Sequence, residues 1–318
     1  MTVQGARVGW YGLGSMGLGM ALNLTRHLKS AGAPPLRYSN RTLEKGKPLA
    51  EAGALPEQNY EAVVNASDIV FTMACISNDQ VLKELTSVAA ESCTSIAGKI
   101  FVDTSTVHPD TSASVSATLA AKGATFISSP VFGASPMAAS GKLIFAMAGP
   151  SAALTAVKPL VLNVMGRSII DMGDDVRKSS LLKISGNILV ISFMEVIAEA
   201  QVFAEVTGIG CTQMEEFIGN MFGPVLESYS HRMTSGAWAP PHGTPPGFAA
   251  SLAAKDARHA LSIANSNDMR IPTMDTALAH LKLARSHAGD MIDSSAVYGC
   301  LRAQAGLPFW SENSRKEP

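Results

Sequence analysis

A glycine-rich turn near the start of the chain constrains the fold more than any other stretch. Residues 8–24 read VGWYGLGSMGLGMALNL: four apolar residues, a G-x-G-x-x-G turn, and apolar residues at helical spacing. In such a unit Gly12 permits the tight turn, Gly14 keeps side chains away from a pyrophosphate, and Gly17 lets helix and strand pack closely. We therefore predict a dinucleotide site whose phosphate-binding residues are Gly12, Leu13, Gly14, Ser15 and Met16. A tight turn that binds nothing is the alternative interpretation.

Composition excludes several classes of partner. Of the 318 residues, 47% are hydrophobic and 16% charged, which is enough apolar material for two domains. The formal net charge of −1, without a Lys/Arg-rich run, gives no electrostatic reason to expect nucleic acid or a membrane surface as partner. The scattered cysteines, Cys75, Cys93, Cys211 and Cys300, lack disulfide or zinc spacing and indicate free thiols in a reducing compartment.

The predicted location is cytoplasmic. The first predicted strand begins almost at the first residue, which leaves no room for a targeting peptide. No apolar run approaches the length expected of a membrane span. We expect a cytoplasmic protein that binds a small-molecule substrate and neither nucleic acid nor membrane.

The second predicted strand, residues 36–39, bears on which dinucleotide binds. It ends in Asn40-Arg41-Thr42, about 20 residues beyond the glycine turn, where the adenosine ribose is expected. A carboxylate here would bind the ribose 2′-hydroxyl, and this stretch has none. Arg41 instead offers a planar cation to a 2′-phosphate, with Asn40 and Thr42 as neutral donors. The pattern favours NADP(H) over NAD(H), unless Arg41 is only a solvated loop residue.

The rest of the chain divides into two composition types. Apolar runs at residues 68–74, 99–104, 124–129, 143–148 and 168–172 alternate with helical stretches such as 79–90 and 151–162. This alternation is typical of an α/β Rossmann-type domain with a parallel sheet. After Gly173 the strand signals end and helical periodicity continues. We predict a dinucleotide-binding domain over residues 1–173 and an all-α domain over residues 174–318.

Two segments of the first domain are candidates for substrate binding. Ser105 and Thr106 follow the run 99–104 at the edge where open α/β sheets bind ligands, so they can donate hydrogen bonds to a carboxylate. Capping of the helix after Pro109 explains either hydroxyl equally well. The small residues of loop 130–143 allow backbone N–H groups to approach an anion, although a plain glycine-rich connection accounts for them nearly as well.

A long helix is predicted to join the two domains. Residues 176–207 contain no proline and one glycine, which allows a single helix of about 30 residues and about 45 Å. Two sets of apolar residues lie on different sides of it: Leu182, Leu189, Phe193, Val196, Ala200 and Phe203, and Ile184, Ile188, Ile191 and Ile197. The obvious ways to bury such a helix are between the two domains and against a second subunit, so we expect a homodimer formed through the helical domain.

Lys183 and Asn187 are the candidate catalytic pair on this helix. They lie four residues apart and therefore share a face. Leu181, Leu182 and Ile184 flank the lysine, and an apolar environment disfavours its charged form. Lys183 would then exchange a proton near physiological pH. The alternative is a solvated helix lysine without a chemical role.

Five motifs in order resemble the 3-hydroxyisobutyrate dehydrogenase family of β-hydroxyacid dehydrogenases, in the 6-phosphogluconate dehydrogenase-like superfamily. They are GLGSMGLGMALNL at 12–24, D-T-S-T with Pro109 at 103–109, the loop at 130–143, K-I-S-G-N at 183–187, and F…K-D at 248–256. The resemblance implies a Rossmann-type domain, a helical domain joined to it by the long helix, and a substrate cleft between them. It also implies an NADP(H)-dependent oxidoreductase acting on a small β-hydroxy acid or semialdehyde, similar to the family's aldehyde and glyoxylate reductases.

The resemblance assigns roles to matching residues. Lys183 matches the general acid/base, Asn187 matches the asparagine that orients the substrate, and Lys255 matches a lysine that closes over cofactor and substrate. Ser105 and Gly133 match positions that hold the substrate carboxylate. The candidate substrate-binding residues are thus Ser105, Thr106, Phe132, Gly133, Ala134 and Lys255, and the further cofactor-binding candidates are Thr106, Phe248 and Lys255.

Departures from the family pattern affect the expected substrate. Phe132 stands where the family usually has serine, Ala134 where it has glycine, and Gly186 replaces the first of two asparagines. A ring in place of a hydroxyl makes the pocket less polar and disfavours 3-hydroxyisobutyrate itself. The alternatives are an imine reductase or reductive aminase, in which the lysine is commonly replaced, and a non-catalytic NADP-binding protein.

The remaining expectations concern metal, one loop and the tail. The seven histidines lack metal-ligand spacing, so no metal is expected, and His259 and His280 are interpreted as ordinary helix residues. The Pro/Gly-rich segment 229–248 is predicted not to be a regular helix. It is interpreted as an interhelix connection, with substrate contact by Trp238 or His242 as the alternative. The tail after Leu307 is expected to fray.

Overall fold

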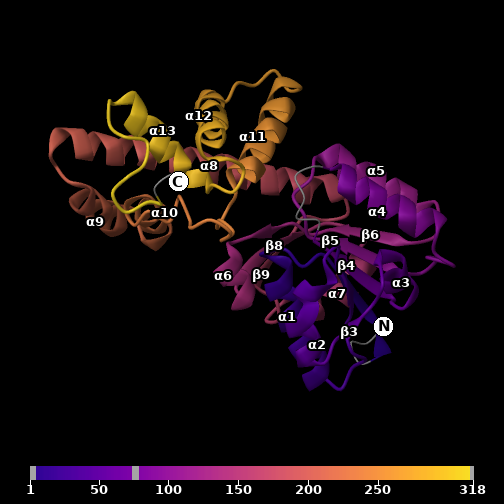
Figure 1. Cartoon of the computed structure of the whole chain (residues 1–318). Coiled ribbons are helices and arrows are strands. Elements are labelled where there is room, and N and C mark those ends of the chain that lie inside the picture. Colours follow the sequence, from indigo (N-terminus) through magenta and orange to yellow (C-terminus); the bar gives the residue numbers. More distant parts are fainter. Residues whose placement is uncertain (1–4, 74–78, 316–318) are drawn as a thin grey trace. The chain divides into compact units, whose positions relative to one another are not determined.

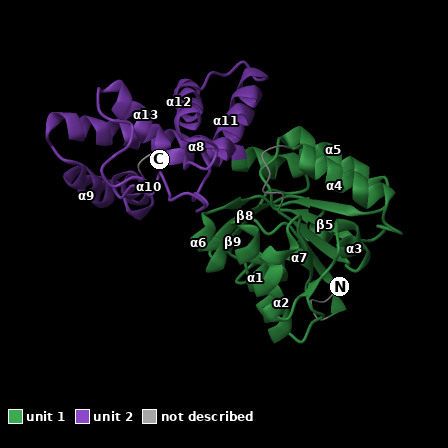
Figure 2. Ribbon diagram, viewed as in Figure 1, with its two compact units in different colours: residues 1–183 green, residues 184–318 purple. Residues whose placement is uncertain are grey.

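The computed structural model describes residues 5–73 and 79–315, in two compact units of residues 1–183 and 184–318 (Figures 1 and 2). The boundary between the units falls inside helix α8 (Val176–Thr207), later in the chain than the predicted boundary at Gly173. Val176 packs into a core of unit 1, and the Ser180 hydroxyl lies 2.8 Å from that of Ser112. The first two turns of α8 therefore belong to unit 1.

Unit 1 is built on a six-stranded parallel sheet of order β3-β2-β1-β4-β5-β6. Its strands are β1 (Val8–Tyr11), β2 (Arg37–Ser39), β3 (Leu55–Pro56), β4 (Ile69–Thr72), β5 (Ile100–Asp103) and β6 (Thr125–Ser128). The order changes direction between β1 and β4, and open α/β sheets bind ligands at such a switch point. The predicted α/β Rossmann-type class is confirmed.

Helices cover both faces of this sheet. Alternate residues of β4 show why its sequence is continuously apolar: Ile69 and Phe71 face one core, and Val70 faces the other. The first core also contains side chains of α1 (Gly17–Ser30), α2 (Lys47–Ala52) and α7 (Ser151–Val161). The second contains side chains of α3 (Tyr60–Asn65), α4 (Gln80–Glu91) and α5 (Pro109–Ala120), of which α4 and α5 lie side by side (Figure 1).

A smaller sheet of order β7-β8-β9 completes unit 1. Its strands are β7 (Val131–Phe132), β8 (Leu143–Met147) and β9 (Gly166–Asp171), with β7 antiparallel to β8. The segment 130–143, interpreted as a loop, therefore begins with a strand and contains a short helix, α6 (Ser135–Ala139). Pairing with β8 converts its first residues into a strand, which local sequence does not reveal.

Helix α8 has the bounds predicted for it, residues 176–207. Ile184, Ile191 and Ile197 are buried in the core of unit 2, whereas Leu189 and Phe203 on the other stripe are exposed. By length and mean hydropathy, α8 could cross a bilayer. The prediction that no apolar run approaches this length is therefore wrong. A single such helix is weak evidence for a membrane span, because core helices of soluble proteins also meet the criterion.

The other elements of unit 2 are helical in the described residues. They are α9 (Cys211–Phe222), α10 (Pro224–Thr234), α11 (Ala250–Asn265), α12 (Pro272–Ala288), a 3₁₀ turn η3 (Ser294–Ala296) and α13 (Val297–Gln304). Helix α10 extends through residues 229–234, so the first part of the Pro/Gly-rich segment is helical, contrary to the prediction. Trp238 is fully buried and stacks on Trp310, which makes it a core residue, whereas His242 is exposed.

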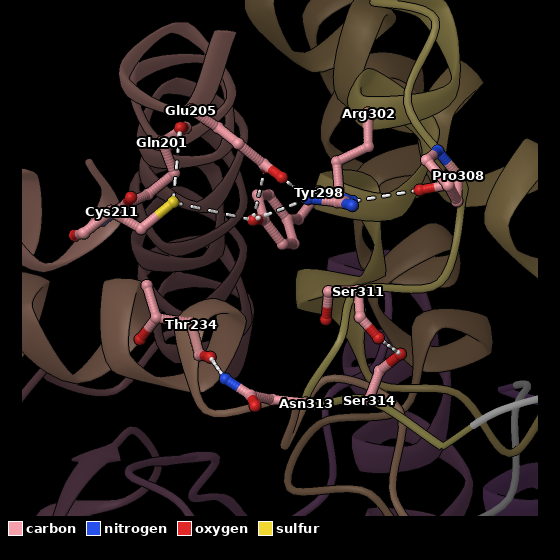
Figure 3. Close-up of polar contacts among 10 residues, drawn as sticks. All are labelled: Gln201, Glu205, Cys211, Thr234, Tyr298, Arg302, Pro308, Ser311, Asn313 and Ser314. Carbon is pink, nitrogen blue, oxygen red and sulfur yellow. Dashed lines mark hydrogen bonds and ion pairs between the residues drawn. The ribbon is translucent and has the colours of Figure 1, made fainter. Parts of the chain in front are cut away.

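The tail after Leu307 is packed as far as Arg315, the last described residue, contrary to the prediction. Phe309 and Trp310 pack against Trp238. Arg302 of α13 donates from Nε to the Pro308 carbonyl and pairs with Glu205, while the Asn313 amide donates to the Thr234 carbonyl (Figure 3). Aromatic packing and these polar contacts hold the tail through Arg315, and neither is visible in the composition of the tail itself.

The cysteine prediction holds for the described thiols. Cys93, Cys211 and Cys300 are free, and Cys75 lies outside the described residues. Burial raises the pKa of the Cys300 thiol to about 12, so this thiol stays protonated at physiological pH.

Candidate functional site

The glycine turn has the backbone geometry that its sequence predicts. Gly12 adopts φ of +101°, and a Cβ added there would lie 2.2 Å from the Met73 carbonyl oxygen. A Cβ at Gly17 would lie 2.1 Å from the Gly12 oxygen. Helix α1 begins at Gly17, and its first turn contains no acidic residue. Its N-cap residue is Met16, whose side chain makes no capping hydrogen bond. Its N-terminus can therefore receive the pyrophosphate of a dinucleotide, and the residues fit this cofactor.

Asn40 links this turn to the segment after β2. Its Oδ1 accepts a hydrogen bond of 2.9 Å from the Leu13 backbone N–H, and its Nδ2 donates to the Thr42 carbonyl at 2.8 Å. The Asn40 amide, predicted to donate a hydrogen bond to the 2′-phosphate, thus holds together the glycine turn and the segment after β2. This second contact could have been anticipated, because Asn side chains commonly bond backbone two residues on.

Arg41 and Thr42 are exposed at the end of β2. Burial raises the pKa of the Tyr11 hydroxyl, and the positive charge of Arg41 opposes that shift. The guanidinium charge therefore acts at the carboxyl end of β1, next to the glycine turn. Lys45 is also exposed, in the 3₁₀ turn η2 (Leu43–Gly46) that follows Thr42, and sequence reasoning missed this second cation. Its position three residues after Thr42 was the available signal.

Ser105 lies at the carboxyl end of β5 and is buried. Its hydroxyl donates to Asp103 Oδ1 at 2.8 Å, and Thr72 donates to the same oxygen at 2.8 Å. The buried Asp103 thus orients Ser105, a role that sequence reasoning missed although the residue stands at the strand end. Thr106 is half-buried. Helix α5 is capped by neither hydroxyl, because its N-cap is His108, whose ring nitrogen accepts from the Asp110 N–H at 3.2 Å.

The amine of Lys183 lies over an aromatic ring. Its Nζ is 4.6 Å from the centroid of Phe132, the residue that departs most from the family pattern. Phe132 belongs to β7, and Gly133 follows it with φ of +130°, where an added Cβ would lie 2.7 Å from Leu143 Cδ2. Ala134 is the N-cap of α6. An ammonium is attracted to a ring face, so this contact is favourable when Nζ is charged.

The environment of Lys183 is less apolar than the sequence predicts. Leu181 is exposed, and Lys183 itself is half-buried. Ile184 is buried in the core of unit 2. Successive residues of a helix point to different sides, so the three flanking apolar residues do not all surround the amine.

In unit 2, three polar residues form one buried group. Asn187 Nδ2 donates to Asp256 Oδ2 at 2.5 Å, and Asp256 Oδ1 lies 3.1 Å from Lys255 Nζ. All three residues are buried. The carboxylate holds both the asparagine one helical turn after Lys183 and the lysine of α11. Sequence reasoning noted Asp256 as part of a motif and missed this positioning role.

The structure therefore brings predicted residues together in local groups. Lys183 meets Phe132, Asn187 meets Lys255 through Asp256, and Leu13 meets Asn40. Among residues 5–73 and 79–315, no cluster of three or more His, Cys, Asp or Glu side chains has the arrangement of a metal site. His280 is a residue of helix α12, as expected, and its Nδ1 lies 2.5 Å from Oε1 of the buried Glu195.

Two family models match the chain along most of its length. The NAD binding domain of 6-phosphogluconate dehydrogenase matches residues 7–173, and the NAD-binding domain of NADP-dependent 3-hydroxyisobutyrate dehydrogenase matches residues 178–301. The chain belongs to the 3-hydroxyisobutyrate dehydrogenase family. Membership confirms the resemblance drawn from the five motifs. It makes the protein an NAD(P)-binding oxidoreductase of the hydroxyacid dehydrogenase type.

Individual relatives span nearly the whole chain. NADH-dependent oxidoreductase ucdB of Aspergillus ustus is 30% identical over 301 residues, which covers 92% of this chain and 98% of that protein. Mycobacterium tuberculosis 3-hydroxyisobutyrate dehydrogenase, solved with L-serine, has a TM-score of 0.76 at 23% identity and covers 95% of this chain and 100% of that one. An imine reductase from Pseudomonas sp. has a TM-score of 0.60 at 16% identity, with coverage of 93% and 99%. Both solved structures share the family's fold.

Gly12→Ala tests the glycine turn. The new Cβ would meet the Met73 carbonyl at 2.2 Å, so we expect weakened NAD(P)H binding and a loss of at least about 2 kcal/mol in unfolding free energy. Gly98→Ala is the matched control: φ is +76°, but the added Cβ meets no described atom within 4 Å, and strain alone costs about 1 kcal/mol. Urea denaturation and cofactor fluorescence measure both effects. Equal losses in the two variants would contradict the close approach at Gly12.

Proposed function

We propose that this protein is an NADP(H)-dependent reductase or dehydrogenase that interconverts a small β-hydroxy acid and its semialdehyde, with Lys183 as general acid/base. The observation that carries the proposal is the half-buried amine of Lys183 over Phe132, on the helix face that also carries Asn187 one turn away. Family membership supplies the reaction type. The residues supply the proton transfer.

The cofactor is held in this proposal by Gly12–Met16 and by the cations after β2. When bound, the nicotinamide supplies a hydride to the substrate carbonyl carbon, or accepts one from the alcohol carbon. In reduction, the Lys183 ammonium donates a proton from Nζ to the carbonyl oxygen, which becomes a hydroxyl. In oxidation, the neutral amine takes the hydroxyl proton. Phe132 favours the ammonium and therefore the donor state.

Substrate recognition in this proposal combines polar donors with one apolar wall. Ser105, Thr106 and the Gly133 backbone bind the carboxylate, and Asp103 keeps the Ser105 hydroxyl oriented. Asn187, fixed by Asp256, orients the substrate near Lys183. Phe132 puts a ring where the family has a hydroxyl, so this wall of the pocket is less polar. The proposed pocket therefore disfavours 3-hydroxyisobutyrate itself.

Lys183→Ala tests the catalytic role. We expect kcat/KM for NADPH-dependent reduction of β-semialdehydes such as malonic semialdehyde to fall by at least about 100-fold, because the proton donor is lost. Lys178→Ala is the control, since Lys178 is exposed on the same helix, and its activity should match that of the parent protein. Undiminished turnover in Lys183→Ala would remove this residue from the mechanism.

The same assay distinguishes the other candidate functions. A panel that includes a cyclic imine reveals an imine reductase if the imine is reduced faster than every semialdehyde. Tight NADPH binding without turnover of any carbonyl or imine would indicate a non-catalytic NADP-binding protein. Retention of both Lys183 and Asn187 favours the dehydrogenase.

We propose further that NADP(H) is preferred over NAD(H). The support is the exposed Arg41 and Lys45 after β2, together with the lack of a carboxylate in β2 and the next three residues, Asn40–Thr42; Glu44 follows in η2. The Aspergillus ustus relative is described as NADH-dependent, so the preference is specific to these residues rather than to the family. Two cations suit a 2′-phosphate by charge and by hydrogen bonding.

Arg41→Ala tests this preference. Losing a charge-assisted hydrogen bond costs about 1.5–3 kcal/mol, so we expect KM for NADPH to rise about tenfold or more while KM for NADH stays nearly constant. Arg26→Ala, at an exposed arginine of α1, should change neither constant. A parallel rise in both constants, or none, would contradict the assignment of Arg41 to the 2′-phosphate.

A homodimer formed through unit 2 completes the proposal. Its support is the exposed apolar stripe of α8 that carries Leu189, Phe193, Val196 and Phe203. Phe217 and Met221 of α9 are exposed as well. Contiguous apolar surface on this scale marks an interaction site, and a second copy is the commonest partner of a folded chain.

Phe193→Glu tests the dimer. A charge on the buried interface should shift the molar mass in sedimentation analysis from dimer toward monomer. Met269→Glu, at an exposed residue between α11 and α12, is the control and should stay dimeric. A parent protein that sediments as a monomer at micromolar concentration would rule out the dimer.

A further inference from the structure

The buried carboxylate of Asp293 has no part in the chemistry above, yet it gathers four hydrogen bonds. Asp293 is fully buried in the segment before η3. Its Oδ1 accepts from Arg232 Nη1 at 3.1 Å and from the Ser295 N–H and hydroxyl at 3.0 and 2.7 Å. Its Oδ2 accepts from the Phe248 N–H at 2.9 Å. A carboxylate with a cation and three neutral donors is a strong anchor, because charge-assisted bonds exceed neutral ones.

Backbone pairing extends this anchor on both sides. The Ser294 N–H donates to the Phe248 carbonyl at 2.7 Å, and the Ala250 N–H donates to the Ile292 carbonyl at 2.9 Å. Residues 248–250 and 292–294 are thereby held together like two paired strands, with Asp293 at the centre. The part of the Pro/Gly-rich segment between α10 and Phe248, residues 235–247, contains no helix or strand. Its end is therefore fixed chiefly from residues 292–295.

This pairing lies where helix α11 begins. The N-cap of α11 is Ala249, which has no side chain able to cap the helix. Lys255 and Asp256 follow within the next two turns of the same helix. A helix transmits a shift of its first turn along its axis, so the position of Lys255 depends on how residues 248–250 are held.

We propose that Asp293 is a positioning residue for cofactor and substrate binding. It holds Phe248 and the first turn of α11, and through them it sets where Lys255 lies. The proposal rests on the proposed function and on the cofactor-binding roles that the family resemblance assigns to Phe248 and Lys255. Arg232 is the counter-ion of this buried carboxylate, with Nη1 3.1 Å from Oδ1.

Asp293→Asn is the direct test, with NADPH as the probe. We expect the Kd for NADPH, measured by fluorescence without turnover, and the KM for malonic semialdehyde to rise about three- to tenfold. The kcat should change much less, because Lys183 is carried by α8 and not by α11. Asp290→Asn is the matched control: this nearby carboxylate is exposed, pairs with Arg285 at 2.6 Å, and should leave all three constants unchanged.

A double-mutant cycle with Lys255→Ala separates positioning from a general loss of stability. If Asp293 acts through Lys255, Asp293→Asn should raise the Kd for NADPH much less in the Lys255→Ala background than in the parent. Ser295→Ala removes only one donor, should fold normally, and should shift the Kd in the same direction by a smaller factor. Fully additive effects, or an unchanged Kd in Asp293→Asn, would overturn the proposal.

The outcome also distinguishes this inference from the proposed function. An effect of Lys255→Ala without any effect of Asp293→Asn contradicts the positioning role alone. No effect of Lys255→Ala on Kd or KM contradicts the assignment of Lys255 to the site, and the positioning role is then lost with it.

Discussion

The continuity of helix α8 is the constraint on which the candidate chemistry depends. Because the helix is unbroken from Val176 to Thr207, Lys183 and Asn187 keep a fixed separation of one turn on one face. Its first two turns pack within unit 1 and the remainder packs within unit 2. A break near residue 183 would uncouple the proposed proton donor from the proposed orienting amide.

Buried carboxylates hold polar groups in place within each unit. Asp103 orients Ser105, Asp256 orients Asn187 and Lys255, and Asp293 anchors the segment that contains Phe248. Each is almost fully buried. A buried carboxylate is costly unless its oxygens are satisfied, so each one demands a particular arrangement of donors. Burying these carboxylates costs stability, but the donors that they require fix the orientation of the neighbouring side chains. A reaction depends on such orientation more than on the affinity for the substrate.

Much of the fold follows from local pattern. The glycine turn, the run at residues 68–74 and the uninterrupted helix 176–207 were interpretable because periodicity and turn chemistry act over a few residues. The short strand Val131–Phe132 was missed because it exists only through pairing with β8. The packed tail was missed because Trp310 stacks on a partner more than seventy residues away in the chain.

For the site, the sequence by itself determined which residue types occupy the glycine turn, the strand ends and the helix face, and so it determined the family and the class of reaction. Only the tertiary structure decided how these residues are held: Phe132 against the Lys183 amine, Asp256 against Asn187, and Asp293 against the start of α11. The physical reason is the separation along the chain over which each interaction acts. Backbone preference and periodicity are properties of neighbouring residues, whereas a ring against a cation or a carboxylate against an amide joins distant segments after the chain has folded.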